Sequence, residues 1–99
     1  MEDIIKLGQL YDFYGELLTD HQKEVYEDLV YNDLSISEIA SSYGISRQGA
    51  HDLIKRINNI LGNYESKLGL VSRFESIKKQ IESLDSLTKE EKDLIVGQL

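Results

Sequence analysis

The sequence contains neither cysteine nor proline among its 99 residues. Without cysteine the chain can form no disulfide framework, no thiol nucleophile and no thiolate metal site. No segment approaches the roughly 18–20 uninterrupted apolar residues that a bilayer-spanning helix needs. The N-terminus is acidic and Lys6 interrupts its apolar run, so it is not a signal peptide. We therefore expect a soluble, cytoplasmic protein without membrane insertion.

The net charge of −7 is distributed unevenly along the chain. Residues 1–33 carry nine acidic residues and two lysines, whereas residues 34–68 carry four basic and three acidic residues. Residues 69–99 are close to neutral, with six acidic and five basic residues. Phosphate binding normally needs a basic surface, so an acidic chain argues against a nucleic-acid ligand unless the basic residues gather in one place. Here the middle third is the only net-positive part.

Apolar residues recur at intervals of three and four along the chain, which is the spacing of amphipathic helices. The first apolar stripe comprises Ile4, Leu7, Tyr11, Tyr14 and Leu18, widened by Leu10 and Leu17. Later stripes comprise Ile54, Ile57, Leu61, Tyr64 and Leu68, and then Leu70, Phe74, Ile77, Ile81 and Leu84. Capping-box pairs predict helix starts at Thr19 with Gln22 and at Thr88 with Glu91. No strand-like alternation is present, so we expect an all-α protein.

The predicted organisation is a helix-turn-helix domain with its N-terminal helices over residues 1–69 and a C-terminal helical extension over residues 70–99. Gly69 is expected to end or kink the preceding helix. The stripe over 70–84 has heptad spacing but covers only about two heptads, fewer than a coiled coil needs. Two arrangements stay open for this extension: folding back onto its own domain, or forming a seam between two copies of the chain.

A helix-turn-helix is predicted from Leu34 to Arg56. Ser35 and Glu38 form a capping box for a first helix, and Gly44 tolerates the positive φ of a helix end. Ile45 is expected to point inward and Ser46 to cap a second helix. The apolar side of that second helix comprises Ala50, Leu53, Ile54 and Ile57. In such a motif the second helix normally enters the major groove of DNA.

The candidate nucleic-acid-binding residues lie at the start of this second helix: Ser46, Arg47, Gln48, His51, Lys55 and Arg56. Arg47 can pair with guanine or phosphate and Gln48 with adenine, whereas Lys55 and Arg56 are better placed for the phosphate backbone. Asp52 lies among them and would repel phosphate unless a lysine or arginine neutralises it. The alternative is a helical hairpin whose outer face is merely solvated and of mixed charge.

Catalysis has little support in the sequence. His21 lies one helical turn from Glu24, but no second histidine or acidic cluster completes a metal site. The chain has no glycine-rich phosphate loop and no Ser–His–Asp arrangement. We therefore expect no catalytic residue, no metal, no cofactor and no enzymatic activity.

Two family resemblances arise from these motifs. Residues 18–56, LTDHQKEVYEDLVYNDLSISEIASSYGISRQGAHDLIKR, resemble the promoter-recognising fourth region of bacterial sigma factors. A closer match covers about residues 8–84, where LYDFYGELLT, YNDLSISEIA, SRQGAHDLIKR and YESKLGL resemble the small bacterial YlxM family of helix-turn-helix proteins. The resemblance implies a helix-turn-helix domain similar to sigma region 4, with a long C-terminal helical extension. It also implies a regulatory role in the signal recognition particle pathway.

Two functions follow from these features. The first is a nucleic-acid-binding regulator whose ligand is DNA or the RNA of the signal recognition particle, acting as a homodimer. The second is a protein–protein adaptor, in which the acidic first third docks on a basic partner such as the GTPase of that particle. In the second case the helix-turn-helix is not inserted into DNA.

Overall fold

The computed structural model describes residues 4–99, which form helices joined by turns without any strand. The all-α prediction is therefore confirmed. The elements are α1 (Ile4–Tyr14), the 3₁₀ helix η1 (Gly15–Leu17), α2 (Asp20–Val30), α3 (Ile36–Tyr43), α4 (Arg47–Leu68), α5 (Leu70–Glu82) and α6 (Lys89–Val96). They fall into two compact units, Met1–Leu68 and Gly69–Leu99.

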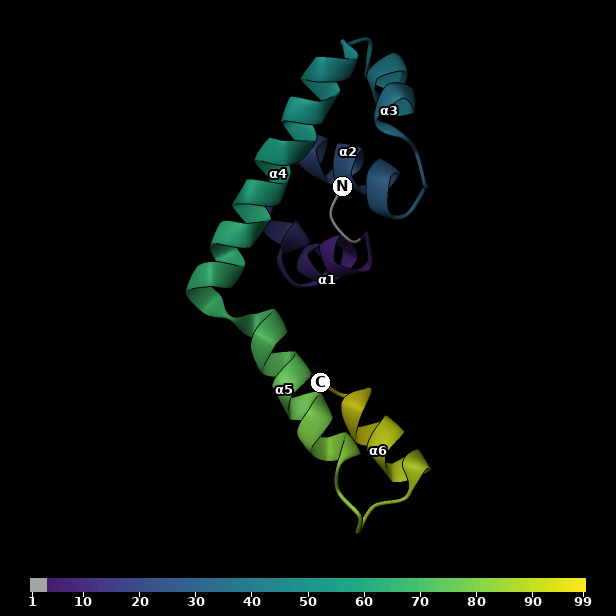
Figure 1. Ribbon diagram of the computed structural model, residues 1–99, viewed down its shortest axis with the longest axis vertical. Coiled ribbons are helices and arrows are strands. Elements are labelled where there is room, and N and C mark those ends of the chain that lie inside the picture. The colour runs from purple at the N-terminus through teal and green to yellow at the C-terminus, as the bar shows by residue number, and fades with distance from the viewer. Residues whose placement is uncertain (1–3) are drawn as a thin grey trace. The chain divides into compact units, whose positions relative to one another are not determined.

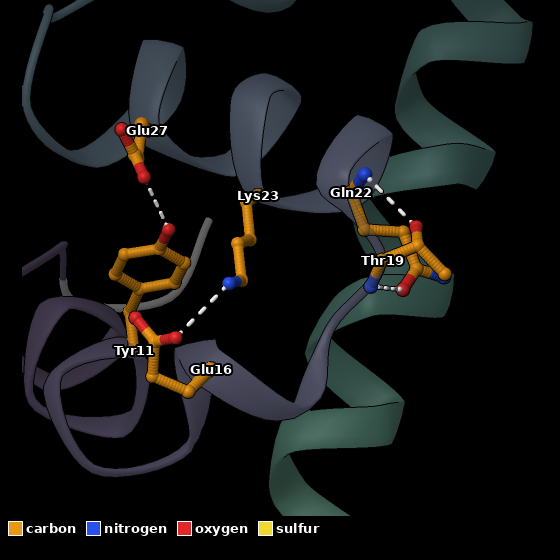
Figure 2. A network of polar contacts seen from close by, with 6 residues as sticks. All are labelled: Tyr11, Glu16, Thr19, Gln22, Lys23 and Glu27. Carbon is orange, nitrogen blue, oxygen red and sulfur yellow. Dashed lines mark hydrogen bonds and ion pairs between the residues drawn. The ribbon is translucent and has the colours of Figure 1, made fainter.

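All three predicted capping boxes are present, at Thr19 with Gln22, Ser35 with Glu38, and Thr88 with Glu91. In the first, the backbone N–H of Gln22 donates to Thr19 Oγ1 over 3.2 Å. The backbone N–H of Thr19 donates in return to Gln22 Oε1 over 3.0 Å (Figure 2). Each box satisfies two amides that a helix start leaves without an intrahelical acceptor. Local side-chain chemistry thus sets where α2, α3 and α6 begin.

The first unit is built around α4, the longest helix of the protein. Helices α1, α2 and α3 all pack against α4 (Figure 1). The buried apolar side chains come from all four helices and from the segment that joins α1 to α2: Leu7, Tyr11, Tyr14, Leu18, Val25, Tyr26, Leu29, Ile39, Ala40, Ala50, Ile54, Ile57 and Leu61. The predicted stripe on α4 is confirmed as far as Leu61, beyond which Tyr64 is half-buried and Leu68 is exposed. Gly62 does not interrupt this helix.

The spacing of the first apolar stripe predicted one continuous helix, but the structure divides the stripe between two elements. α1 ends at Tyr14 and the chain tightens into η1, which has about three residues per turn instead of 3.6. The change of period turns Leu17 outward, where 55% of it is exposed, so its predicted place in the stripe is wrong. Leu18 follows in an extended conformation and is buried. Ile4, at the other end of the stripe, is also exposed.

Tyrosine–carboxylate hydrogen bonds cross-link the first unit. The Tyr14 hydroxyl donates to Glu65 Oε1 over 2.6 Å and so joins α1 to α4. A second such bond joins Tyr11 to Glu27 and holds α1 against α2 (Figure 2). Similar bonds join Tyr31 to Asp12 over 2.8 Å and Tyr43 to Asp28 over 2.7 Å. Several acidic residues of the first third thus serve as internal acceptors.

These bonds predict that the protein loses stability in alkali. Partial desolvation, together with the hydrogen bond to Asp12, raises the pKa of Tyr31 from 10.0 to about 12. Burial and a carboxylate partner also raise the pKa of Tyr11 and of Tyr43. The folded protein therefore holds these protons more tightly than the unfolded chain. The stabilisation that these neutral tyrosine hydroxyls give the folded protein is fully present below about pH 10. It is lost as the pH rises through their pKa values in the folded state.

The measurement is the urea midpoint followed by circular dichroism between pH 8 and pH 11.5. We expect a constant midpoint up to about pH 9.5 and a progressive decline above it. The variant Tyr43→Phe, which has one such hydroxyl fewer, should decline less steeply. A midpoint that stays constant up to pH 11.5 would contradict the role given to these bonds.

The second unit is a helical hairpin. Helices α5 and α6 lie side by side (Figure 1), and Lys92 Nζ donates to the backbone oxygen of Glu82 over 2.8 Å. Gly69 precedes α5 with φ +63°, so α4 ends there as predicted. No residue from 69 to 99 is buried within the chain, and the predicted stripe leaves Ile77 and Leu84 exposed.

Candidate nucleic-acid interface

The turn between α3 and α4 is built from backbone hydrogen bonds around one glycine. Gly44 adopts φ +68° and ψ 32°, a left-handed conformation that a side chain would disfavour. Its N–H donates to the oxygen of Ser41, and the N–H of Ile45 donates to the oxygen of Ala40 over 3.0 Å. This is the Schellman arrangement, in which a glycine ends a helix and satisfies its last carbonyls. The predicted glycine turn is confirmed.

Ile45 departs from its prediction. The sequence predicted an inward side chain at this position, but 40% of Ile45 is exposed. A Schellman turn often lets the residue after the glycine contact the last turn of the helix, but it leaves Ile45 largely at the surface here. The apolar contact between the two helices comes instead from Ile39 and Ala40 on α3 and from Ala50 and Ile54 on α4, all of which are buried.

Ser46 caps α4, as predicted. Its Oγ accepts from the backbone N–H of Gly49 over 2.9 Å. A Cβ at position 49 would lie 3.0 Å from that Oγ, which is tighter than normal contact. The absence of a side chain at Gly49 thus leaves room for the capping hydroxyl.

The six candidate residues share one exposed surface. Ser46 lies at the cap, and the other five follow along the exposed side of the first three turns of α4: Arg47, Gln48, His51, Lys55 and Arg56. The opposite side of the same turns is buried through Ala50, Ile54 and Ile57. We call the surface formed by the six candidates and Asp52 the α4 face. Its side chains are free of the core and can reach a ligand.

Arg47 makes one contact that sequence spacing did not predict. Its Nε donates to Ser37 Oγ over 3.1 Å and so links the first turn of α4 to the first turn of α3. Arg47 and Ser37 also line an open hollow, together with Leu29, Leu34, Ser35 and Ile36. The bond uses only Nε, so the terminal nitrogens of the guanidinium remain available to an acceptor. The contact joins residues ten positions apart on different helices, which no helical spacing indicates.

Asp52 is not neutralised by a lysine or arginine among the described residues, so the expected repulsion of phosphate stands. Among the described residues, its partners are Gln48, whose Nε2 donates to Oδ1 over 2.9 Å, and His51, whose Nδ1 lies 3.6 Å from the same oxygen. The spacing of Gln48 and Asp52 by four residues brings them together on one helix face. That spacing was the signal in the sequence for this pair.

Lys55 and Arg56 supply the free positive charge of the α4 face. Both are exposed, and neither forms an ion pair with a carboxylate within residues 4–99. They lie two turns beyond Arg47. Because nine residues correspond to two and a half turns, Arg47 and Arg56 lie at opposite edges of the exposed surface, with Lys55 between them.

The remaining candidate groups do not form a site. His21 is exposed and its ring lies nearly perpendicular to that of Tyr43, with the centroids 5.7 Å apart. Within the described residues, no cluster of three or more histidine, aspartate or glutamate side chains could hold a metal ion.

None of the helices in residues 4–99 has both the length and the apolar character needed to cross a bilayer.

Comparison with known proteins decides the family. Residues 1–97 match the model of UPF0122, described as "Putative helix-turn-helix protein, YlxM / p13 like". The chain belongs to this family. The predicted resemblance to YlxM is thereby confirmed.

Members of UPF0122 resemble this chain over most of its length. The family member from Caldanaerobacter subterraneus is 46% identical over 83 residues, which cover 84% of this chain and 71% of that protein. The one from Clostridium kluyveri is 46% identical over 92 residues, covering 88% and 82%. The one from Malacoplasma penetrans is 44% identical over 79 residues, covering 80% and 73%. The UPF0122 description and the α3–α4 geometry agree on a helix-turn-helix.

Proposed function

We propose that this UPF0122 protein is a regulatory protein that binds nucleic acid through the α4 face. The observation that carries the proposal is the arrangement of Arg47, Lys55 and Arg56 along the exposed side of a capped helix that follows a helix-turn. Guanidinium and ammonium groups at this spacing can contact phosphates, while Gln48 and His51 between them can reach base edges. Family membership supports the proposal, because the family is described as helix-turn-helix.

Duplex DNA is the ligand that this geometry suits best. The major groove of B-DNA is about 12 Å wide and admits an α-helix, whereas the major groove of A-form RNA is too narrow for side chains to enter. The RNA of the signal recognition particle, which the family resemblance implies, would have to be bound through loops or its shallow groove. We propose that pathway as the biological setting.

Fluorescence anisotropy across a salt series tests this proposal. The protein is titrated against a labelled mixed-sequence DNA duplex and against a labelled hairpin RNA of equal length, between 50 and 300 mM salt. We expect saturable binding to the duplex, with a logarithmic affinity that falls linearly with the logarithm of the salt concentration. Absence of binding to either nucleic acid at 50 mM salt would overturn the proposal.

We further propose a homodimer that covers the second unit. Two short helices without any buried side chain gain little stability from their own contacts, because helices of this length are marginal in water. Pairing of the exposed residues Ile77, Leu84 and Leu94 with those of a second copy would bury them. A dimer would also bring two α4 faces into one assembly, as paired half-sites in DNA require.

Sedimentation velocity at micromolar concentration tests the dimer. We expect the sedimentation coefficient of a dimer of the 11.3 kDa chain, and a shift towards the monomer when Ile77 and Leu84 are both replaced by glutamate. As a matched control, replacement of the exposed polar residues Ser76 and Gln80 with glutamate should leave the dimer intact. A wild-type protein that sediments as a monomer at these concentrations would overturn the proposed homodimer.

The acidic surface of α1, η1 and α2 favours a second candidate function, that of a protein–protein adaptor. Asp12, Glu16, Asp20 and Glu24 are all exposed. Such a surface can dock on a basic partner, and the GTPase of the signal recognition particle is the partner that the family resemblance implies. The two candidates respond differently to mutation: neutralising these acids should weaken an adaptor complex, whereas changes on the α4 face should leave it intact.

A further inference from the structure

Asp52 is the only acidic residue between Ser46 and Arg56, and it lies on the α4 face. A carboxylate there repels phosphate, so its direct effect on backbone binding is unfavourable. Its contribution to an interface must therefore come from contact with a base or from its action on a neighbouring side chain. The contacts made by Asp52 indicate the second.

The carboxylate of Asp52 fixes the orientation of the Gln48 amide. An ionised carboxylate only accepts hydrogen bonds, so the amide must present its nitrogen to Asp52 and turn its oxygen away. The 2.9 Å bond from Gln48 Nε2 to Asp52 Oδ1 has this geometry. A free glutamine amide can rotate to exchange its donor and acceptor ends, and the bond to Asp52 removes that freedom.

The groups that remain on Gln48 match one base. Nε2 carries two hydrogens, and one of them is used by Asp52. The oxygen and the second N–H stay available side by side. Adenine presents a donor at N6 and an acceptor at N7 in the major groove, which is the complement of this pair. Guanine presents two acceptors there, N7 and O6, and would leave the glutamine oxygen facing an acceptor.

We propose that Asp52 is a positioning residue that orients Gln48 for recognition of adenine in the major groove of duplex DNA. This inference rests on the proposed function, because it requires the α4 face to lie in that groove. His51 Nδ1 lies 3.6 Å from the same Asp52 oxygen and so contributes a second polar neighbour to the carboxylate. Asp52 raises selectivity by orienting the amide and at the same time lowers affinity for DNA of any sequence through its charge.

Selection from a library of randomised DNA duplexes tests the inference, because sequencing the bound fraction gives the base preference at each position. We expect the wild-type protein to prefer adenine at one position of its site by about 5- to 150-fold. Gln48→Ala should abolish that preference. Asp52→Ala should reduce it by about 5-fold or more at the same position, and should raise affinity for mixed-sequence duplex.

Two further variants separate positioning from charge. Glu24→Ala removes one exposed acid from α2, so it should leave every base preference unchanged. Asp52→Glu keeps the acceptor and should restore part of the adenine preference that Asp52→Ala loses. Circular dichroism checks that each variant is folded.

The outcomes distinguish this inference from the proposed function. If Asp52→Ala raises affinity but keeps the full adenine preference, Asp52 acts through its charge alone and the inference is overturned. If the wild-type protein binds duplex DNA without any preference for adenine, the inference fails while the proposed function stands. If no duplex is retained at low salt, the proposed function fails for DNA, and the inference fails with it.

Discussion

Replacing Arg47, Lys55 and Arg56 together with glutamate is expected to weaken duplex binding at 0.1 M salt by at least about 500-fold. Each phosphate contact contributes a salt-dependent term to the logarithm of the affinity, with a slope of about 0.9 per contact. Loss of three contacts lowers that slope by about 2.7. At 0.1 M salt, a change of this size in the slope corresponds to an affinity about 500-fold lower. Reversing the charges adds repulsion to the lost attraction. Anisotropy titrations of both proteins across a salt series measure both effects.

The second unit offers a matched control for this prediction. Arg73, Lys79 and Lys89 are also exposed, and replacing them with glutamate changes the net charge by the same amount. We expect the control to weaken binding by less than about tenfold, since distant charges act only through the screened general field. Equal losses in the two triple variants would show that net charge governs binding and that the α4 face has no special role.

The second large effect concerns the packing of α4. Ile57 is completely buried on the helix against which α1, α2 and α3 all pack. Ile57→Ala removes three carbons from a fully buried site, which typically costs about 2–5 kcal/mol. A domain of this size is stable by only about 3–10 kcal/mol in total. We therefore expect the variant to be partly or largely unfolded at 37 °C.

Urea unfolding followed by circular dichroism measures this cost. Ile60 lies on the same helix but is only half-buried, so Ile60→Ala deletes the same atoms from a partly solvated position. We expect Ile60→Ala to cost less than about 1.5 kcal/mol, because its carbons were never fully removed from water. Similar costs for the two variants would contradict the placement of the core along this side of α4.

Features with a local cause could be predicted from the sequence. The capping boxes depend on two side chains three residues apart, and the helix-turn depends on one glycine, so spacing alone predicts them. The structure confirms all three boxes, the left-handed conformation of Gly44 and the end of α4 at Gly69. The buried side of α4 was predictable for the same reason, because a period of 3.6 residues determines which side chains share a helix face.

Features that depend on contacts between helices could not be predicted. The bond between Tyr14 and Glu65 joins residues 51 positions apart, and no local pattern pairs them. The bond from Arg47 to Ser37 likewise depends on how α3 meets α4. Leu17 was misassigned because helical periodicity says nothing about where a helix tightens into a 3₁₀ turn. In each case tertiary packing determines which partner a side chain meets.

The candidate site was predictable as a set of residues, but its polar contacts were less so. All six predicted residues lie on the exposed surface at the start of α4, as the helical pattern required. The sequence left open whether a lysine or arginine neutralises Asp52, and the structure pairs it with Gln48 and His51 instead. Both are close to Asp52 in sequence, so the spacing is compatible with these contacts. It is equally compatible with a contact to Lys55 or Arg56, and it could not predict which would form.

An NMR titration of the isotope-labelled protein with duplex DNA tests the central claim most directly, because it locates the ligand on the molecule. We predict salt-sensitive, saturable chemical-shift changes in the backbone amides of residues 46–56 and in the side-chain signals of Arg47 and Gln48. The same titration should leave the amides of α6 unchanged. Changes confined to α1 and α2, or no change at low salt, would contradict nucleic-acid binding through the α4 face.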